Sequence, residues 1–185
     1  MVERFFGPMN PVIPLLRAAR FLLGWSQADV ALTLDIKPKT IQLIERGKYK
    51  LLPREAWILK AHYQKALVEF TDATPHHGAG VRWSVPGIKM EDEILDHFGG
   101  RIVRSARGLV DLSQRQLAEI AKIDPSFIAR LETNRYGALN EATLKKLEVG
   151  LRSVNVEMTA ETSLVGAGVR WITAPPEAAS IYKDE

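Results

Sequence analysis

The chain has 185 residues, of which 46% are hydrophobic and 25% are charged, and it contains no cysteine. This composition is ordinary for a globular protein, and it excludes a fibrous, disordered or disulfide-stabilised chain. No apolar run approaches the roughly 18 residues that a membrane span requires, and the first residues lack the apolar stretch of a secretory signal, so we expect a cytoplasmic protein.

A duplication organises the chain. When Arg17–Tyr49 is placed over Arg104–Tyr136, twelve of 33 positions are identical. The similarity resumes where Gly78–Trp83 and Gly166–Trp171 share the sequence Gly-Ala-Gly-Val-Arg-Trp. A repeat of this length is too long for one layer of a solenoid, so each copy is predicted to be a small domain with its own core. The expected division is a first domain at 1–84, a linker at 85–93, a second domain at 94–173 and a tail at 174–185.

The two copies differ in charge. Residues 1–84 hold 12 Lys and Arg against 7 Asp and Glu, a net charge of +5, whereas residues 85–185 hold 13 against 15, a net charge of −2. A basic domain gains affinity for phosphate by releasing condensed counterions, whereas an acidic one must bind nucleic acid through a local patch. Nucleic acid is therefore an expected ligand of the first copy above all.

The first predicted helix has one buried face and ends at Gly24. Its apolar residues recur at steps of three and four, as expected of an amphipathic helix. These residues are Val12, Leu15, Leu16, Ala19, Leu22 and Leu23.

Two short helices joined by a tight turn are predicted next. Ser26 is placed to cap a helix over about 27–34. Pro38, whose fixed φ suits the first helical position, is predicted to begin another helix over about 38–46, which Gly47 ends. Two such helices form a helix-turn-helix. The second copy repeats these signals at Ser113, which forms a capping box with Gln116, at Pro125 and at Asn134.

A fourth helix and a hairpin complete each copy. The helix is predicted over about 54–65 and again over 141–153, and apolar residues then alternate at Val68/Phe70 and Val81/Trp83, which indicates two half-buried strands. A lone two-stranded hairpin is only marginally stable in water. The two hairpins are therefore predicted to pair, in the same chain or between the chains of a homodimer. The fold class is mainly α, with two helix-turn-helix bundles that are each followed by a short β-hairpin.

The first copy carries the pattern Arg20…Ser26-Gln27-x-x-Val30-Ala31…Ile36-x-Pro38-x-Thr40-Ile41-x-x-Ile44-Glu45-x-Gly47. It resembles the Cro/XRE family of phage-repressor-like helix-turn-helix proteins, and this resemblance covers each copy from its first helix to its fourth. It implies two lambda-repressor-like bundles. The second copy has Asn134 where the family usually has Gly, and Asp124 where a small polar residue is common. It keeps Arg107, Ser113-Gln114, Leu117-Ala118, Ile123, Pro125, Ile128 and Leu131-Glu132.

The resemblance implies that the third helix of each copy lies in the major groove of DNA, with side chains near its N-terminus at the base edges. Lys39 would donate to guanine, Gln42 would form paired bonds to adenine, and the fork of Arg130 would bond two guanine acceptors. The base-reading candidates are Lys37, Lys39, Thr40, Gln42 and Leu43 in the first copy and Ser126, Phe127, Ala129 and Arg130 in the second.

Other positions are expected to contact DNA phosphates, which position a protein without reading sequence. Gln27 and Gln114 resemble a family phosphate contact at the start of the second helix, where free backbone amides favour an anion. Lys48, Lys50 and Arg135 follow the recognition helices; the alternative is that they form only a solvated surface.

Two ion pairs are expected to be structural. Arg20 with Glu45, and Arg107 with Glu132, match a family ion pair that joins the first helix to the end of the third.

No cofactor, metal site or enzymatic activity is expected. His76-His77 lie in a predicted loop, but the second copy has Ser163-Leu164 there and no third ligand is near in sequence. No nucleophile–base pair, phosphate loop or carboxylate pair is apparent. The four tryptophans, Trp25, Trp57, Trp83 and Trp171, are expected to pack in the cores or hairpins.

The expected function is sequence-specific binding of double-stranded DNA by a transcriptional repressor, with two headpieces that read an asymmetric operator of two unlike half-sites. In the alternative, the second domain does not read DNA but dimerises or docks on a protein, as in an antitoxin-like or anti-activator module, with Phe127 as an exposed contact. The expected partners are double-stranded DNA, a second copy bound through the hairpins, and a protein bound by the second domain, with no membrane. The expected location is the bacterial cytoplasm, in association with the nucleoid.

Overall fold

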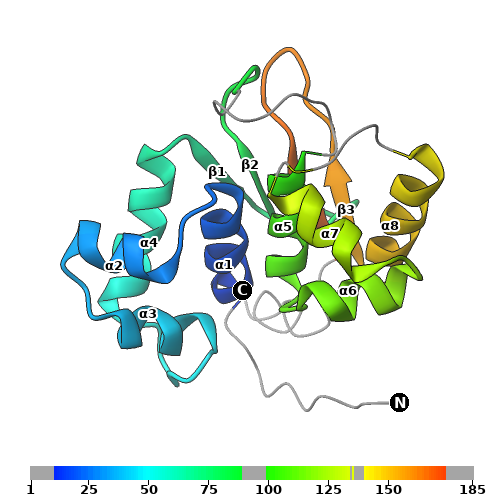
Figure 1. Cartoon of the computed structure of the whole chain (residues 1–185). Helices are drawn as coiled ribbons and strands as arrows, with labels where there is room; N and C mark the ends of the chain where they lie inside the picture. The colour runs from blue at the N-terminus through cyan, green and yellow to red at the C-terminus, as the bar shows by residue number, and fades with distance from the viewer. Residues whose placement is uncertain (1–10, 89–98, 134, 136–139, 174–185) are drawn as a thin grey trace.

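The computed structural model describes residues 11–88, 99–133, 135 and 140–173, in which eight helices and a four-stranded sheet are found (Figure 1). The mainly helical class predicted from the sequence is confirmed. No helix in these ranges combines the length and apolar character needed to cross a membrane. The predicted tail at 174–185, part of the predicted linker and the helix stop at Asn134 lie outside the described residues.

The first bundle follows the predicted order of helices closely: α1 spans Val12–Leu22, α2 Gln27–Leu34, α3 Pro38–Glu45 and α4 Arg54–Lys65. Ser26 caps α2 with its side chain, which accepts a hydrogen bond from the backbone of Asp29 at 3.1 Å. The Asp29 carboxylate accepts one from the backbone of Ser26 at 2.8 Å in return. The first copy therefore has a capping box too, with Asp in place of the usual Glu or Gln.

The second bundle repeats the first: α5 spans Gly100–Leu109, α6 Gln114–Ala121, α7 Pro125–Glu132 and α8 Glu141–Ser153. Ser113 and Gln116 form the predicted capping box. Asp124 caps α7, because its carboxylate accepts a hydrogen bond from the backbone of Ser126 at 2.7 Å.

Helices α1 and α5 pack against each other and join the two bundles in one hydrophobic core. Helix α1 was predicted to bury one face, but every residue from Ile13 to Arg20 is buried, because α1 contacts both its own bundle and α5. Ser105 donates a hydrogen bond to the Ala18 carbonyl across this contact at 2.9 Å. A side chain at Gly108 would crowd the ring of Phe21, so the glycine permits the close approach.

Each bundle holds an ion pair between its first and third helices, which is buried in the first bundle and partly buried in the second. In the first, Arg20 and Glu45 are 4% and 3% exposed, and both arms of the guanidinium lie 2.6 Å from a carboxylate oxygen. In the second, Arg107 and Glu132 form the same two bonds at 2.8 Å. Such two-pronged pairs fix the relative orientation of the helices that carry them.

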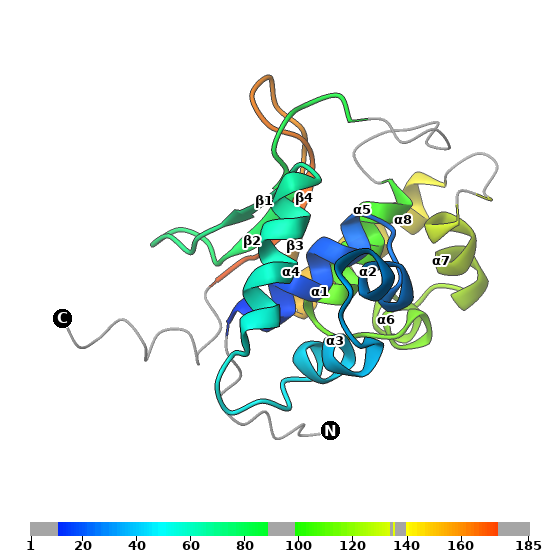
Figure 2. The same ribbon diagram turned by 90° about the vertical axis from the view of Figure 1, so that its left-hand side faces the viewer.

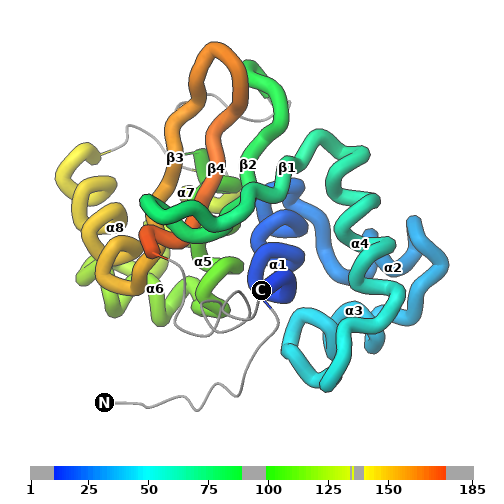
Figure 3. The backbone as a smooth tube through the Cα atoms, turned by 180° about the vertical axis from the view of Figure 1, so that it is seen from behind, coloured from blue at the N-terminus to red at the C-terminus, as the bar shows by residue number. Residues whose placement is uncertain are grey.

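The two hairpins pair within the chain. Strands β1 (Val68–Thr71) and β2 (Gly80–Trp83) form one hairpin, β3 (Val156–Thr159) and β4 (Gly168–Trp171) form the other, and the sheet order is β1-β2-β4-β3, antiparallel throughout (Figure 3). At the central seam Val81 lies opposite Val169, the same position in each repeat. The sheet is thus related to itself by an approximate twofold axis between β2 and β4.

Glycine is required at that seam. A Cβ atom at Gly80 would collide with the Val169 carbonyl oxygen, and one at Gly168 with the Val81 carbonyl oxygen. Both collisions are with backbone, which cannot move aside without separating the strands.

One aromatic prediction is wrong. Trp83 is buried under the sheet, but Trp57 is 52% exposed on α4. It lies on the outer face of that helix, whose inward positions are Ala56, Leu59 and Tyr63, and the ammonium of Lys60 lies 5.9 Å from its ring centre.

We expect Glu45→Ala to lower the free energy of unfolding by about 3–5 kcal/mol, because Arg20 would keep a buried charge without its partner. Urea denaturation followed by circular dichroism measures the change. Glu119→Ala is the matched control, since it removes an ion pair with Arg115 whose side chains are 62% and 83% exposed, and should cost no more than about 1 kcal/mol. The double variant Arg20→Met/Glu45→Leu should recover most of the loss. A cost for Glu45→Ala equal to that of the control would contradict the structural role.

We expect Gly168→Val to separate β2 from β4 while leaving the helix content unchanged. Hydrogen exchange measured by NMR should then lose its protection at the amides of Trp83 and Trp171, which donate across the seam to Ala167 and Ala79 at 3.1 and 3.0 Å. Thr159→Val, a replacement of similar shape on the same sheet, should leave both amides protected. Retained protection in Gly168→Val would show that the seam tolerates a side chain.

Candidate nucleic-acid interface

Helix α3 presents its polar candidates on the face opposite the core. Ile41 and Ile44 are fully buried, whereas Lys37 and Lys39 are exposed. Thr40, Gln42 and Leu43, the other candidates of this copy, are partly exposed. Lys39 donates a hydrogen bond to the Gln42 carboxamide at 3.0 Å, so the two predicted base-reading side chains lie side by side.

Helix α7 also buries apolar residues and exposes polar ones, but its exposed side chains differ from those of α3. Ile128 and Leu131 are buried, and Ser126 and Arg130 are exposed. Arg130 donates to the Ser126 carbonyl at 3.3 Å. Ala129 is half-buried, and Phe127 is half-buried against the core, which makes Phe127 less available to any ligand than the sequence suggested.

Basic residues follow α3 directly. Lys48 and Lys50 are exposed in the loop to α4, and Arg135 is exposed after α7. The second copy has an acidic residue at the start of its recognition helix. Asp124 is exposed at the N-terminus of α7, where its hydrogen bonds from Ser126 lower the pKa of its carboxyl group. A permanent negative charge at the start of α7 reduces the attraction of that helix end for phosphate.

The two glutamines predicted to contact phosphate also contact the ion pairs between the first and third helices. The Gln27 carboxamide donates to Glu45 at 2.8 Å, and the Gln114 carboxamide donates to Glu132 at 2.9 Å. A carboxamide nitrogen has two hydrogens, so each glutamine keeps one donor for a further acceptor. The glutamine thereby links the start of the second helix to the end of the third, a role that the sequence analysis missed although the residue recurs in both copies.

Arg17 joins the end of α3 to the other bundle, and the sequence analysis missed this too. Its buried guanidinium donates to the Glu45 carbonyl at 2.9 Å and to the Gly108 carbonyl at 2.6 Å, and it lies 3.1 Å from the Asp111 carboxylate. Burial lowers the pKa of Arg17, while Asp111 and Glu45 oppose the shift. The identity of Arg17 and Arg104 in the two repeats was the available signal.

The counterpart of this contact in the second copy is different. Arg104 lies with its guanidinium 5.1 Å from the ring centre of Phe21, which occupies the position equivalent to Gly108. Arg20 and Arg107 also lie over that ring, at 4.7 and 5.3 Å. The contact between α1 and α5 is therefore asymmetric in its side chains although the backbone is nearly symmetric.

In Figure 2 the strands lie to the left and α7 to the far right, with α1 and α5 between them, while α3 lies below α1. The strands pack against the first and fourth helices of the two bundles rather than against α3 or α7. This arrangement leaves the exposed faces of α3 and α7 free of the sheet.

Comparison with known families agrees with this geometry. A family model described as a helix-turn-helix domain matches residues 15–62, and another described as helix-turn-helix matches residues 103–157. No curated protein and no solved structure matches the chain. The matched segments run from within α1 to within α4 and from within α5 to within β3, and so contain both helix-turn-helix units. The chain carries two helix-turn-helix domains in tandem, one in each bundle, and the two matches are consistent with a tandem Cro/C1-type regulator.

Proposed function

We propose that the protein is a repressor that binds a double-stranded operator of two unlike half-sites, one for each helix-turn-helix of a single chain. The observation that carries this proposal is the intrachain pairing of β2 with β4 together with the packing of α1 on α5. In ordinary members of this class a homodimer supplies two recognition helices about 34 Å apart, one turn of DNA. Here one chain supplies both helices.

The half-sites should differ because the exposed side chains of α3 and α7 differ. Lys39 and Gln42 in the first copy would favour guanine and adenine, respectively, and Arg130 in the second would favour guanine. Lys48 and Lys50 would contact backbone phosphates, as Arg135 would in the second copy. Gln27 and Gln114 would add phosphate contacts through their remaining donors.

Selection of bound sites from a random duplex pool at about 150 mM salt tests the proposal, because moderate salt suppresses nonspecific phosphate binding. We expect two unlike half-sites, centred about one turn apart. A perfect palindrome would instead imply that two copies of the first domain, from two chains, read the DNA. If no sequence is enriched, the protein does not recognise a specific DNA sequence and the proposal is wrong.

Lys39→Ala and Arg130→Ala should each weaken binding to the selected operator by about 1–3 kcal/mol, since each removes a base contact. Fluorescence anisotropy with labelled duplex measures the affinity. Each variant should also relax the sequence preference of its own half-site only. Lys65→Ala, at the far end of α4, is the control and should bind as the unaltered protein does.

A second candidate function is favoured by the charge of the second copy. Residues 85–185 carry a net charge of −2, and Asp124 is exposed at the start of α7. In this case the second domain docks on a protein or dimerises, while only the first reads DNA. Unchanged DNA affinity in Arg130→Ala would favour this candidate. A homodimer through the sheet would have to use the outer strands β1 and β3, because β2 and β4 already pair with each other.

A further inference from the structure

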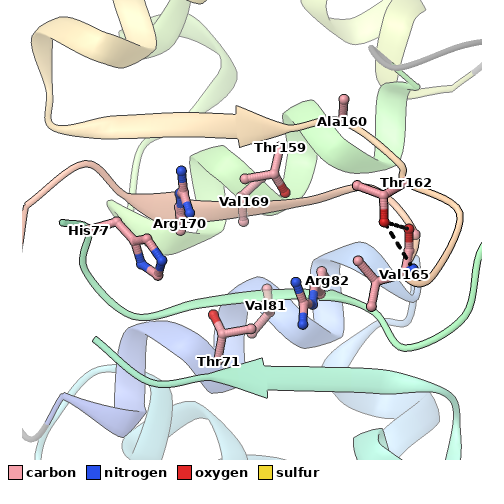
Figure 4. A pocket seen from close by; sticks show the side chains of 11 residues that line it. Thr71, His77, Val81, Arg82, Thr159, Ala160, Thr162, Val165, Val169 and Arg170 are labelled. Carbon is pink, nitrogen blue, oxygen red and sulfur yellow. Dashed lines mark hydrogen bonds between the residues drawn. The ribbon is translucent and has the colours of Figure 1, made fainter. Parts of the chain in front are cut away.

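A pocket of about 240 Å³ lies on the face of the sheet that points away from α1 and α5 (Figure 4). Val81 and Val169 bury their side chains on the helix side, so their neighbours Arg82 and Arg170 project to the opposite side. The pocket therefore straddles the seam between the two repeats, and no residue of α3 or α7 lines it.

The two arginines of this face lie opposite glycines. Gly80 lies opposite Arg170, and Gly168 lies opposite Arg82. The backbone collisions described above require glycine at both positions. Each arginine therefore faces a glycine across the seam, one on either side of the approximate twofold axis.

The charged groups that line the pocket are two guanidinium groups, each paired with a carboxylate that lies outside the lining. Arg82 and Arg170 are the charged residues of the lining, and no carboxylate belongs to it. Glu69 lies to the side of Arg82 and accepts two of its hydrogen bonds, at 2.7 and 3.0 Å, and Glu157 accepts one from Arg170 at 2.6 Å. These carboxylates fix the orientation of the guanidinium groups, which stay about one-third exposed.

Further donors surround the arginines. Thr71 and Thr159 line the pocket from equivalent positions of the outer strands, and their hydroxyl groups bond to no other residue of the described chain. Arg82 and Arg170 are diagonal neighbours across β2 and β4, a separation that long side chains can bridge. His77 and Val165 also line the pocket. They directly precede Gly78 and Gly166, so alignment through the shared Gly-Ala-Gly-Val-Arg-Trp segment pairs His77 with Val165 rather than with Leu164.

We propose that this pocket binds a small organic dicarboxylate, with one carboxylate on Arg82 of the first repeat and the other on Arg170 of the second. Guanidinium groups bind carboxylates through charge-assisted hydrogen bonds, and the threonine hydroxyls supply neutral donors. The volume is below the roughly 300 Å³ at which pockets for drug-sized ligands begin, so the ligand is a small metabolite.

Binding of the ligand would stabilise the four-stranded sheet. Its site is complete only when β2 and β4 are paired, so binding stabilises the paired arrangement by mass action. The inference does not depend on DNA binding, because no residue of α3 or α7 lines the pocket.

Isothermal titration calorimetry of the full chain with malonate, succinate, glutarate and inorganic phosphate tests the proposal. We expect saturable binding of at least one dicarboxylate at one site per chain. Arg170→Gln should weaken it by at least roughly tenfold, because a charge-assisted contact is lost. Arg115→Gln removes an exposed arginine on α6 and should leave the affinity unchanged. Saturable binding of phosphate alone, or of no probe, would overturn the proposal, as would equal losses in the two variants.

A measurement on the unaltered protein covers the case in which Arg170→Gln does not fold. Addition of the bound dicarboxylate should shift the NMR signals of backbone amides at Gly80, Arg82, Gly168 and Arg170. Shifts confined to the amides of α3 and α7 would place the ligand outside the pocket and would overturn the proposal.

Discussion

The structure depends on the pairing of β2 with β4. Each hairpin alone would be marginal in water, with one apolar face and an unpaired edge. The pairing supplies both missing contacts at once, since it joins the backbone edges and places Val81 and Val169 together over α1 and α5. The glycines at the seam allow this approach, and the contact between α1 and α5 extends it into the core. The orientation of one helix-turn-helix relative to the other follows from these two contacts.

Much of the fold could be predicted because its signals are local. Serine caps, prolines at first helical positions and the apolar periodicity determine where helices begin, and α2, α4 and α8 have the predicted bounds. Strand alternation likewise indicated which residues face the core. It could not indicate which strand would pair with which, because periodicity defines a face and not a partner; both an intrachain and an interchain sheet satisfied it. The exposure of Trp57 was missed for a related reason, since residue type alone does not say which face of α4 meets the core.

Only part of the candidate site could be predicted from the sequence. The burial of Ile41, Ile44, Ile128 and Leu131 follows from helical spacing, and it leaves the candidates of α3 and α7 on the outer face. The hydrogen bonds that support α3 and α7 from the inside join residues far apart in sequence. Arg17, for example, donates to the carbonyl of Gly108 in the other repeat. Such contacts depend on how two bundles pack and have no signal within one repeat. The substitution of Phe21 by Gly108 between copies marks where the duplicated halves have specialised at their shared contact.

The covalent union of the two domains would have a consequence for gene control by the proposed repressor. A repressor that must assemble from separate subunits occupies its operator in proportion to the square of its concentration when the subunits are dilute. A chain with both headpieces already joined replaces that assembly step with an intramolecular one, at an effective concentration on the order of millimolar. Occupancy of a two-half-site operator would then rise with the first power of the concentration, and a cell could keep the gene silent with few molecules. The cost is a more gradual switch, because the steepness that assembly provides is lost.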